Sequence, residues 1–239
     1  MLISIKAETL FQVGGLNITN ALFTTWVTML VLIIVAFIVK TNLKAVPSKL
    51  QSILEATLEF LLNIIDVVTG SREISKKFFP LLVTLFLFIV TANWLALLPG
   101  FGSIVFKHGN EVVPLFRGAN ADLNTTIALA LIASVAIQVT GFKYQGFRYL
   151  TKFVNFHGVS AFFVGILELV SEITKPISFA FRLFGNIFAG EVLLVVVTSL
   201  IPILAPTPFI ALEIFVGFIQ GLVFSMLTLI FLRLTMTSH

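Results

Sequence analysis

Long apolar runs separated by short polar segments dominate the pattern along the chain. Residues 20–39 are almost wholly apolar, and no charged residue occurs between Glu8 and Lys40. Two further charge-free runs cover residues 78–106 and 123–142. A membrane-spanning helix needs about 20 mainly apolar residues, so each run is long enough for one span. The predicted spans are, in chain order, 18–41, 77–99 and 122–142.

The C-terminal region has a longer pattern. From Val159 to Leu200 it stays helical over about 42 residues, or about 63 Å at 1.5 Å per residue. The hydrocarbon core is only about 30 Å thick, so such a helix must bend or lie strongly tilted. Pro176 and Gly185 are candidate bend points, and Pro202 ends the segment. We therefore predict a hairpin of two long, strongly tilted helices, at 157–200 and 207–236.

Residues 47–70 differ from these runs because their apolar positions recur every three or four residues, with acidic residues between them. This spacing predicts an amphipathic helix. Ser48 and Gln51 have the spacing of a capping box, and Gly70 ends the pattern. Such a helix fits the membrane surface. Packing within a soluble subdomain is the alternative.

The composition supports a membrane protein. Of 239 residues, 58% are hydrophobic and only 11% are charged, and the mean hydropathy is +1.09. A soluble domain has about 25% charged residues. The pattern contains no internal repeat, low-complexity tract or linker. We therefore predict an all-α polytopic protein with about five membrane helices and one amphipathic surface helix, forming a single membrane-embedded domain over residues 1–239.

The net charge of +4 does not indicate nucleic-acid binding, because the basic residues are scattered rather than gathered in a stripe. Ten of them lie in the segments 40–77 and 143–152 and at Arg233. Three others, Lys6, Lys107 and Arg117, lie on the opposite side if the N-terminus is outside. The positive-inside rule then places the C-terminus in the cytoplasm. The absence of cysteine excludes disulfides and thiol nucleophiles.

Polar and ionisable residues interrupt the two long helices. Each ionisable group inside a membrane costs about 2.5–3.5 kcal/mol or more, and such groups usually face a cavity or a partner. The residues concerned are Glu168, Glu172, Lys175, Arg182, Glu191, Glu213 and Gln220. Mutually neutralising structural pairs are the alternative explanation.

Helical geometry divides these residues into two polar zones with Arg182 between them. Four residues fall within about 40° of Arg182 at 100° per residue: Glu168, Lys175, Ser178 and Asn186. Glu191 falls on the opposite side, about 13 Å further along the axis. Glu213 and Gln220 are seven residues apart and share one face. Because arginine is never deprotonated, Arg182 can block a proton path between the zones. A carboxylate on another, moving subunit would carry protons past it.

Four segments resemble subunit a of the F-type ATP synthase in sequence. They are GANADLNTTIALAL (118–131), ELVSEITKPIS (168–178), FRLFGNIFAGE (181–191) and FIQGLVFSMLTLIFL (218–232). The resemblance covers nearly the whole chain in order, and R-L-F-G-N is its most specific part. It implies a stator of bacterial type that conducts protons through two offset half-channels to a rotating ring of c subunits.

The resemblance also implies roles for individual residues. Arg182 matches the essential arginine that faces the ring carboxylates. Asn186, Glu191 and Gln220 match polar positions along the path. Asp122 and Asn124 match the start of the helix near the outer channel, where Glu213 also belongs. Several bacterial relatives have histidine at the position of Glu213, so two glutamates are a departure from the family pattern. The inner-channel candidates are Glu168, Glu172, Lys175 and Ser178.

The implied partners are the c-subunit ring, the peripheral-stalk b subunits, the lipid bilayer and, indirectly, the F1 sector. We expect the bacterial plasma membrane, no cofactor and no metal. The sequence has no Walker motif, so we expect no ATP-hydrolysing site in this chain. A secondary transporter and a purely structural anchor are the rival functions. Transporters usually have two similar halves, which this chain lacks. The coupling ion, H⁺ or Na⁺, stays open.

Overall fold

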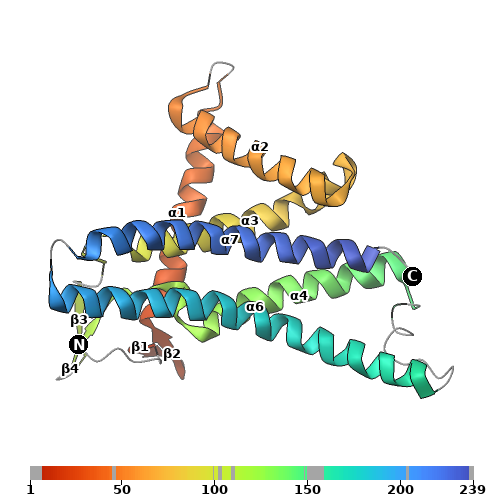
Figure 1. Cartoon of the computed structure of the whole chain (residues 1–239). Coiled ribbons are helices and arrows are strands. Elements are labelled where there is room, and N and C mark those ends of the chain that lie inside the picture. The colour runs from red at the N-terminus through yellow and green to blue at the C-terminus, as the bar shows by residue number, and fades with distance from the viewer. Residues whose placement is uncertain are drawn as a thin grey trace.

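The computed structural model describes residues 7–44, 47–98, 100–101, 104–108, 111–147, 149, 159–202 and 205–236. Within these residues the chain forms six α-helices (Figure 1). They are α1 Asn20–Thr41, α2 Lys49–Thr69, α3 Arg72–Ala96, α4 Leu123–Gln145, α6 Val159–Leu200 and α7 Pro206–Met236. All but α2 are long and apolar enough to cross a membrane. The predicted all-α polytopic class is confirmed.

The observed bounds of the helices differ by a few residues from the ranges predicted from the sequence, and the largest difference concerns α3. It begins at Arg72, five residues before the predicted span, because the chain turns directly from α2 into α3. At this corner Gly70 takes the left-handed conformation with φ of 66°. Thr69 Oγ1 and Ser75 Oγ share a hydrogen bond of 2.7 Å across it. The charged first turn of α3 therefore precedes its apolar part.

The predicted capping box at the start of α2 forms only in part. The Gln51 amide nitrogen of the backbone donates to Ser48 Oγ over 3.4 Å. The Gln51 side chain does not return to Ser48. It donates instead to the Lys44 carbonyl over 3.2 Å and to Glu55 over 2.8 Å. Lys44 is thereby held against the first turns of α2.

Two short antiparallel hairpins were not predicted from the sequence. β1 Thr9–Val13 pairs with β2 Leu16–Thr19, and β3 Val105–His108 pairs with β4 Glu111–Pro114. The first hairpin turns at Gly14 and Gly15, whose positive φ angles suit a two-residue turn. β1 also contacts β3, so both hairpins lie at the same end of the molecule.

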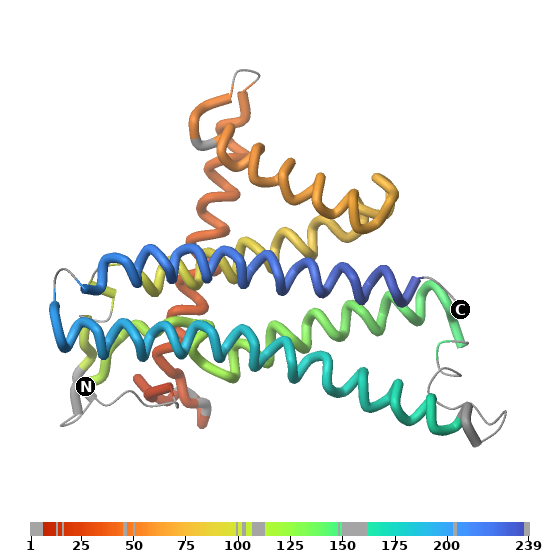
Figure 2. The backbone as a smooth tube through the Cα atoms, viewed as in Figure 1, coloured from red at the N-terminus to blue at the C-terminus, as the bar shows by residue number. Residues whose placement is uncertain are grey.

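The long helices α6 and α7 run side by side in opposite directions, with α3 and α4 packed along them (Figure 1). α1 crosses this group at a steep angle, so the long hairpin is strongly inclined to α1. α2 packs on α3 and α7 at the end away from the strands. α6 bends in the middle of its length (Figure 2). Pro176 lies within that helix and removes one backbone donor there, which is a common cause of a bend.

The main apolar core lies where α3, α4, α6 and α7 meet. Its buried members include Ile89, Ala133, Ala180, Leu183 and Phe224. Helix α7 approaches α3 closely, because a Cβ atom at Gly221 would lie 2.7 Å from the Val90 side chain. Small residues allow such contact between membrane helices. One face of α6 is thus buried in this core, whereas Arg182 lies on an exposed part of the same helix.

Candidate functional site

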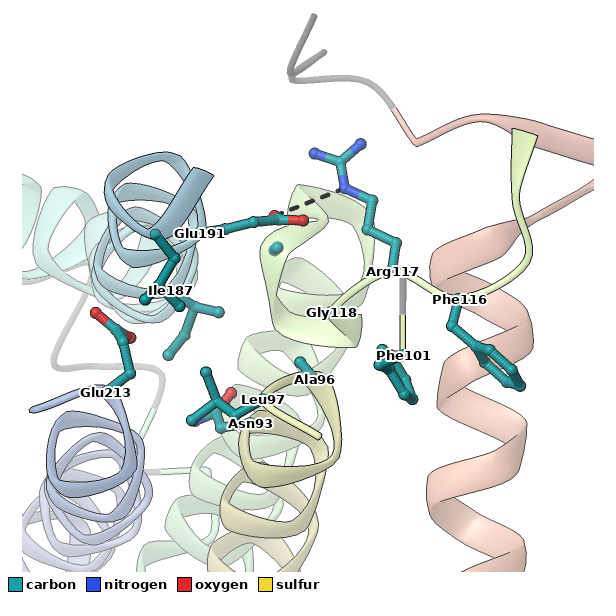
Figure 3. A pocket seen from close by; sticks show the side chains of 12 residues that line it. Asn93, Ala96, Leu97, Phe101, Phe116, Arg117, Gly118, Ile187, Glu191 and Glu213 are labelled. Atoms are coloured by element: carbon teal, nitrogen blue, oxygen red, sulfur yellow. Dashed lines mark ion pairs between the residues drawn. The ribbon is translucent and has the colours of Figure 1, made fainter. Parts of the chain in front are cut away.

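A cavity of about 130 Å³ lies between α3, α6, α7 and the segment that precedes η2 Ala119–Ala121 (Figure 3). Its polar lining consists of Asn93, Arg117, Glu191 and Glu213, and its other lining residues are mostly apolar. One water needs roughly 10–15 Å³ of such volume, so several waters fit. The cavity lies at the strand end of the molecule. Glu191 and Glu213, which the sequence analysis assigned to different helices, both line this cavity.

Glu213 reaches this cavity from α7 and is only 8% exposed. Its carboxylate lies directly against Gly190 of α6, where any Cβ atom would overlap it. Glu191, the next residue of α6, points the other way, toward Arg117 (Figure 3). Arg117 Nε lies 3.9 Å from Glu191 Oε2. The cavity therefore combines two carboxylates with one guanidinium.

Sequence reasoning missed the role of Arg117, which it counted only among the outer basic residues. The side chain is 8% exposed. Its neighbour Phe116 stacks on Phe101 with ring centroids 4.8 Å apart, and it also contacts Phe23 at 5.6 Å. The Arg117 backbone nitrogen donates to Thr24 Oγ1 over 3.3 Å. The sequence did contain a signal for this role, because Arg117 is the one charged residue of the segment VVPLFRG (112–118).

Two asparagines that the sequence analysis did not select form the polar floor beside this cavity. Asn120 Nδ2 donates to Asn93 Oδ1 over 2.8 Å, and Asn93 Nδ2 donates to the Gly217 carbonyl over 3.2 Å. Both side chains are buried. Gly217 leaves room for this contact, since a Cβ atom there would lie 3.0 Å from Asn93 Cβ. The amide chain fixes η2, α3 and α7 relative to one another.

Asn186 and Gln220, both predicted site residues, meet between α6 and α7. Asn186 Nδ2 donates to Gln220 Oε1 over 2.9 Å. Gln220 is 5% exposed, whereas Asn186 lies at the exposed edge of the contact. The bond joins the two long helices one turn beyond Arg182.

Arg182 itself lies on the exposed face of α6, together with Ser178 and Asn186. Within the described ranges, no hydrogen bond or ion pair reaches its guanidinium. The neighbouring residue Leu183 is fully buried in the core. The fold therefore leaves Arg182 exposed on the surface of this chain.

Glu172 and Lys175 form an ion pair on α6 and are both largely buried. Gln138 Nε2 of α4 donates to Glu172 Oε2 over 2.7 Å. Lys175 Nζ lies 4.9 Å from the ring centre of Phe231 on α7, within the range of a cation–π contact. The cluster therefore ties α4, α6 and α7 together. The charges of Glu172 and Lys175 neutralise each other, which agrees with the alternative explanation that ionisable residues in these helices form structural pairs.

Tyr149 closes the same region beyond the end of α4. Its side chain is fully buried, and its ring lies against Gly141. Burial, followed by the nearby negative charges of Glu172 and Glu168, raises the pKa of Tyr149 to about 12. Glu168 and Glu172 thus share one neighbourhood at the end of the molecule away from the cavity.

The remaining predicted residues, Asp122 and Asn124, lie at the start of α4. Asp122 is 6% exposed, and Asn124 Nδ2 donates to its Oδ1 over 3.3 Å. Neither residue lines the cavity that contains Glu191 and Glu213. In the part of the chain that the structure describes, no group of three or more His, Asp or Glu side chains is arranged to hold a metal ion.

The architecture and the polar residues within the long helices agree with a comparison against known protein families. The sequence model of the family described as ATP synthase A chain matches residues 22–233. The match extends from the start of α1 to the last turns of α7, so it includes both long helices. The predicted resemblance is confirmed. The chain belongs to the ATP synthase A chain family and is a multi-pass membrane subunit of the proton-translocating sector.

Proposed function

We propose that this chain is the stator that conducts protons through two offset half-channels to and from a rotating c-ring. It acts as a single membrane domain over residues 1–239, and it couples the proton gradient to ATP synthesis carried out elsewhere in the complex. The separation of its polar groups supports this proposal. One group lines the cavity at the strand end, and the other lies at the opposite end of α6.

The outer half-channel begins at the cavity. Its volume of about 130 Å³ admits waters, and Glu191 and Glu213 supply exchangeable protons. Gln220 and Asn186 continue the polar path along the α6–α7 contact toward Arg182. Asp122 and Asn124 lie at the start of α4 and do not line the cavity. They would therefore contribute to the outer half-channel outside the cavity itself.

The inner half-channel runs along the end of α6 that carries Glu168, Glu172, Lys175 and Ser178. Glu172 is held by Lys175 and Gln138, which favours a positioning role for this carboxylate. Glu168 lies one turn away and is partly exposed, which suits proton exchange with water. Ser178 lies on the exposed face between this region and Arg182.

The observation that carries the proposal is the orientation of Arg182. A charged side chain at the level of the membrane interior costs several kcal/mol unless it meets a partner or water. Because the described part of this chain supplies no such partner, a carboxylate on a neighbouring subunit is the fitting one. A permanent guanidinium would hold that carboxylate ionised, release it when it is protonated, and block direct proton leakage.

The proposed setting is the bacterial plasma membrane, with the N-terminus outside and the C-terminus in the cytoplasm. The positive-inside distribution supports this orientation. The c-ring would contact the exposed face of α6, and the peripheral-stalk b subunits would hold the chain against rotation. Contact with the F1 sector would be indirect.

Cross-linking tests which face meets the ring. Single cysteines at Ser178 and Gly185 lie seven residues apart on the exposed side of α6, and a side chain at Gly185 meets nothing within 4 Å. We expect both to form disulfides with a cysteine placed beside the ring carboxylate. The control is Val135→Cys on α4, which is 58% exposed but lies on another helix. Equal cross-linking of all three, or of Val135→Cys alone, would contradict the proposed face.

A further inference from the structure

Arg117 brings a fixed positive charge into the outer cavity. Its guanidinium lies 3.9 Å from the Glu191 carboxylate, and the side chain is 8% exposed. Glu213 is the other charged residue of the cavity lining. Since arginine stays protonated at any working pH, its charge is permanent. The cavity therefore holds at most one negative charge in excess, although two carboxylates line it.

The position of Arg117 is defined by contacts on both sides of the residue. Phe116 stacks on Phe101, and the Arg117 backbone nitrogen donates to Thr24 of α1. Gly118 follows, and a Cβ atom there would lie 3.4 Å from the side chains of Ala96 and Ala121. These contacts involve the neighbours and the backbone of Arg117, so they persist when its side chain is substituted.

A cavity with two carboxylates and no cationic side chain would favour metal cations. Carboxylate oxygens are the preferred ligands of hard cations, and a low-dielectric wall concentrates ions of opposite charge. A metal ion must enter the cavity bodily and approach the carboxylates. A proton instead passes between waters and carboxylates by exchange of hydrogen bonds. A guanidinium beside Glu191 therefore opposes the entry of a metal ion far more than it opposes proton exchange.

We propose that Arg117 is a selectivity-determining residue of the outer half-channel, which positions the Glu191 carboxylate and keeps monovalent metal cations out of the cavity. This inference rests on the proposed function, since it assigns a property to the same proton path. Arg117 differs in role from Arg182. Arg182 faces outward from the chain, whereas Arg117 belongs to the enclosed entrance.

The test measures ATP-driven proton pumping by the whole complex in vesicles while Na⁺ rises on the side of the outer cavity. Choline replaces Na⁺ to keep the ionic strength constant. We expect pumping by the parent complex to be insensitive to Na⁺. In Arg117→Gln, Na⁺ should inhibit pumping, with a half-inhibitory concentration at least tenfold lower than in the parent. Arg117→Lys keeps the charge and should stay close to the parent.

Two further variants separate charge from structure. Arg233→Gln makes the same substitution in the last turn of α7, away from the cavity, and should leave the Na⁺ response unchanged. The double variant Arg117→Gln/Glu191→Gln removes both charges of the pair, and its amides can hydrogen-bond to each other. It should be less sensitive to Na⁺ than Arg117→Gln. If Arg117→Gln alone does not assemble, Arg117→Met, which removes the same charge, serves as the test variant and should show the same inhibition of pumping by Na⁺.

An Arg117→Gln complex with the parent's Na⁺ response would overturn the inference, even if its pumping is slower at every Na⁺ concentration. Equal Na⁺ sensitivity of Arg117→Lys and Arg117→Gln would also overturn it, because the charge would then not be the cause. These outcomes leave the proposed function intact. Its failure would appear instead as pumping by a complex that lacks Arg182.

Discussion

The carboxylate of Glu213 on α7 lies directly against Gly190 on α6. Because Gly190 has no side chain, the buried carboxylate of Glu213 can reach the cavity that also contains Glu191. The approach of the two long helices thus sets the geometry of the outer half-channel. Gly190 acts by leaving space rather than by any chemistry of its own.

Gly190→Ala tests this relationship. The new methyl group overlaps the Glu213 carboxylate, which must move, and small displacements in a reaction path can cost up to about a hundredfold in rate. We expect pumping to fall by about tenfold or more in complexes that assemble normally. Gly190→Ala/Glu213→Asp shortens the displaced side chain and should recover part of the loss. Full pumping by Gly190→Ala would show that the contact does not matter.

The Asn186–Gln220 hydrogen bond predicts non-additive stability. Replacing Asn186 with Leu leaves the buried Gln220 amide without its partner, which costs about 1–3 kcal/mol. Gln220→Leu should have a similar effect, while the double variant should lose less than the sum of the two. Thermal unfolding of the purified complex measures the three values. Strict additivity would mean that the bond contributes nothing.

The raised pKa of Tyr149 predicts a stability loss at alkaline pH. The unfolded chain releases the phenolic proton near pH 10, whereas the folded chain keeps it up to about pH 12. This stabilisation is therefore complete below pH 10 and is lost as the pH rises from 10 to 12. Tyr149→Phe lacks the proton, so its thermal midpoint should fall less between pH 8 and pH 11. Equal falls in both proteins would contradict the assignment.

The charge distribution predicts the orientation of the chain. Cysteines can be introduced singly, because the sequence contains none. Phe147 is 88% exposed beyond α4, and Ile104 is 53% exposed beside β3. An impermeant thiol reagent added outside intact cells should label Ile104→Cys and not Phe147→Cys. Inverted vesicles should give the opposite pattern, and labelling of Phe147→Cys alone from outside would reverse the topology.

The helices of this fold could be predicted from the sequence because each has a recognisable pattern of apolar residues. Apolar runs about 20 residues long indicate spans, and Ser48 and Gly70 mark the ends of α2 directly. The first hairpin was missed although Gly14 and Gly15 form its turn. Its strands are too short to establish a period of two over the background of apolar residues.

The site was predictable only where residues share one helix or match the family. Mutually neutralising pairs were the alternative explanation for the ionisable residues, and Glu172 and Lys175 form one such pair on α6. The contribution of Gln138 depends on how α4 packs against α6. Arg117 and Asn93 belong to separate elements, and only the tertiary fold brings them to Glu191 and Glu213. No period along the chain encodes that arrangement.

Proton flux through vesicles that carry Arg182→Ala tests the central claim most directly. The assembled variant should show no ATP-driven pumping, because the ring carboxylate loses its counter-charge. A passive proton leak should also open between the two polar groups. Arg182→Lys keeps a charge without the planar, permanently protonated fork, so it should fail nearly as badly. Substantial ATP-driven pumping by an assembled Arg182→Ala complex would contradict the account.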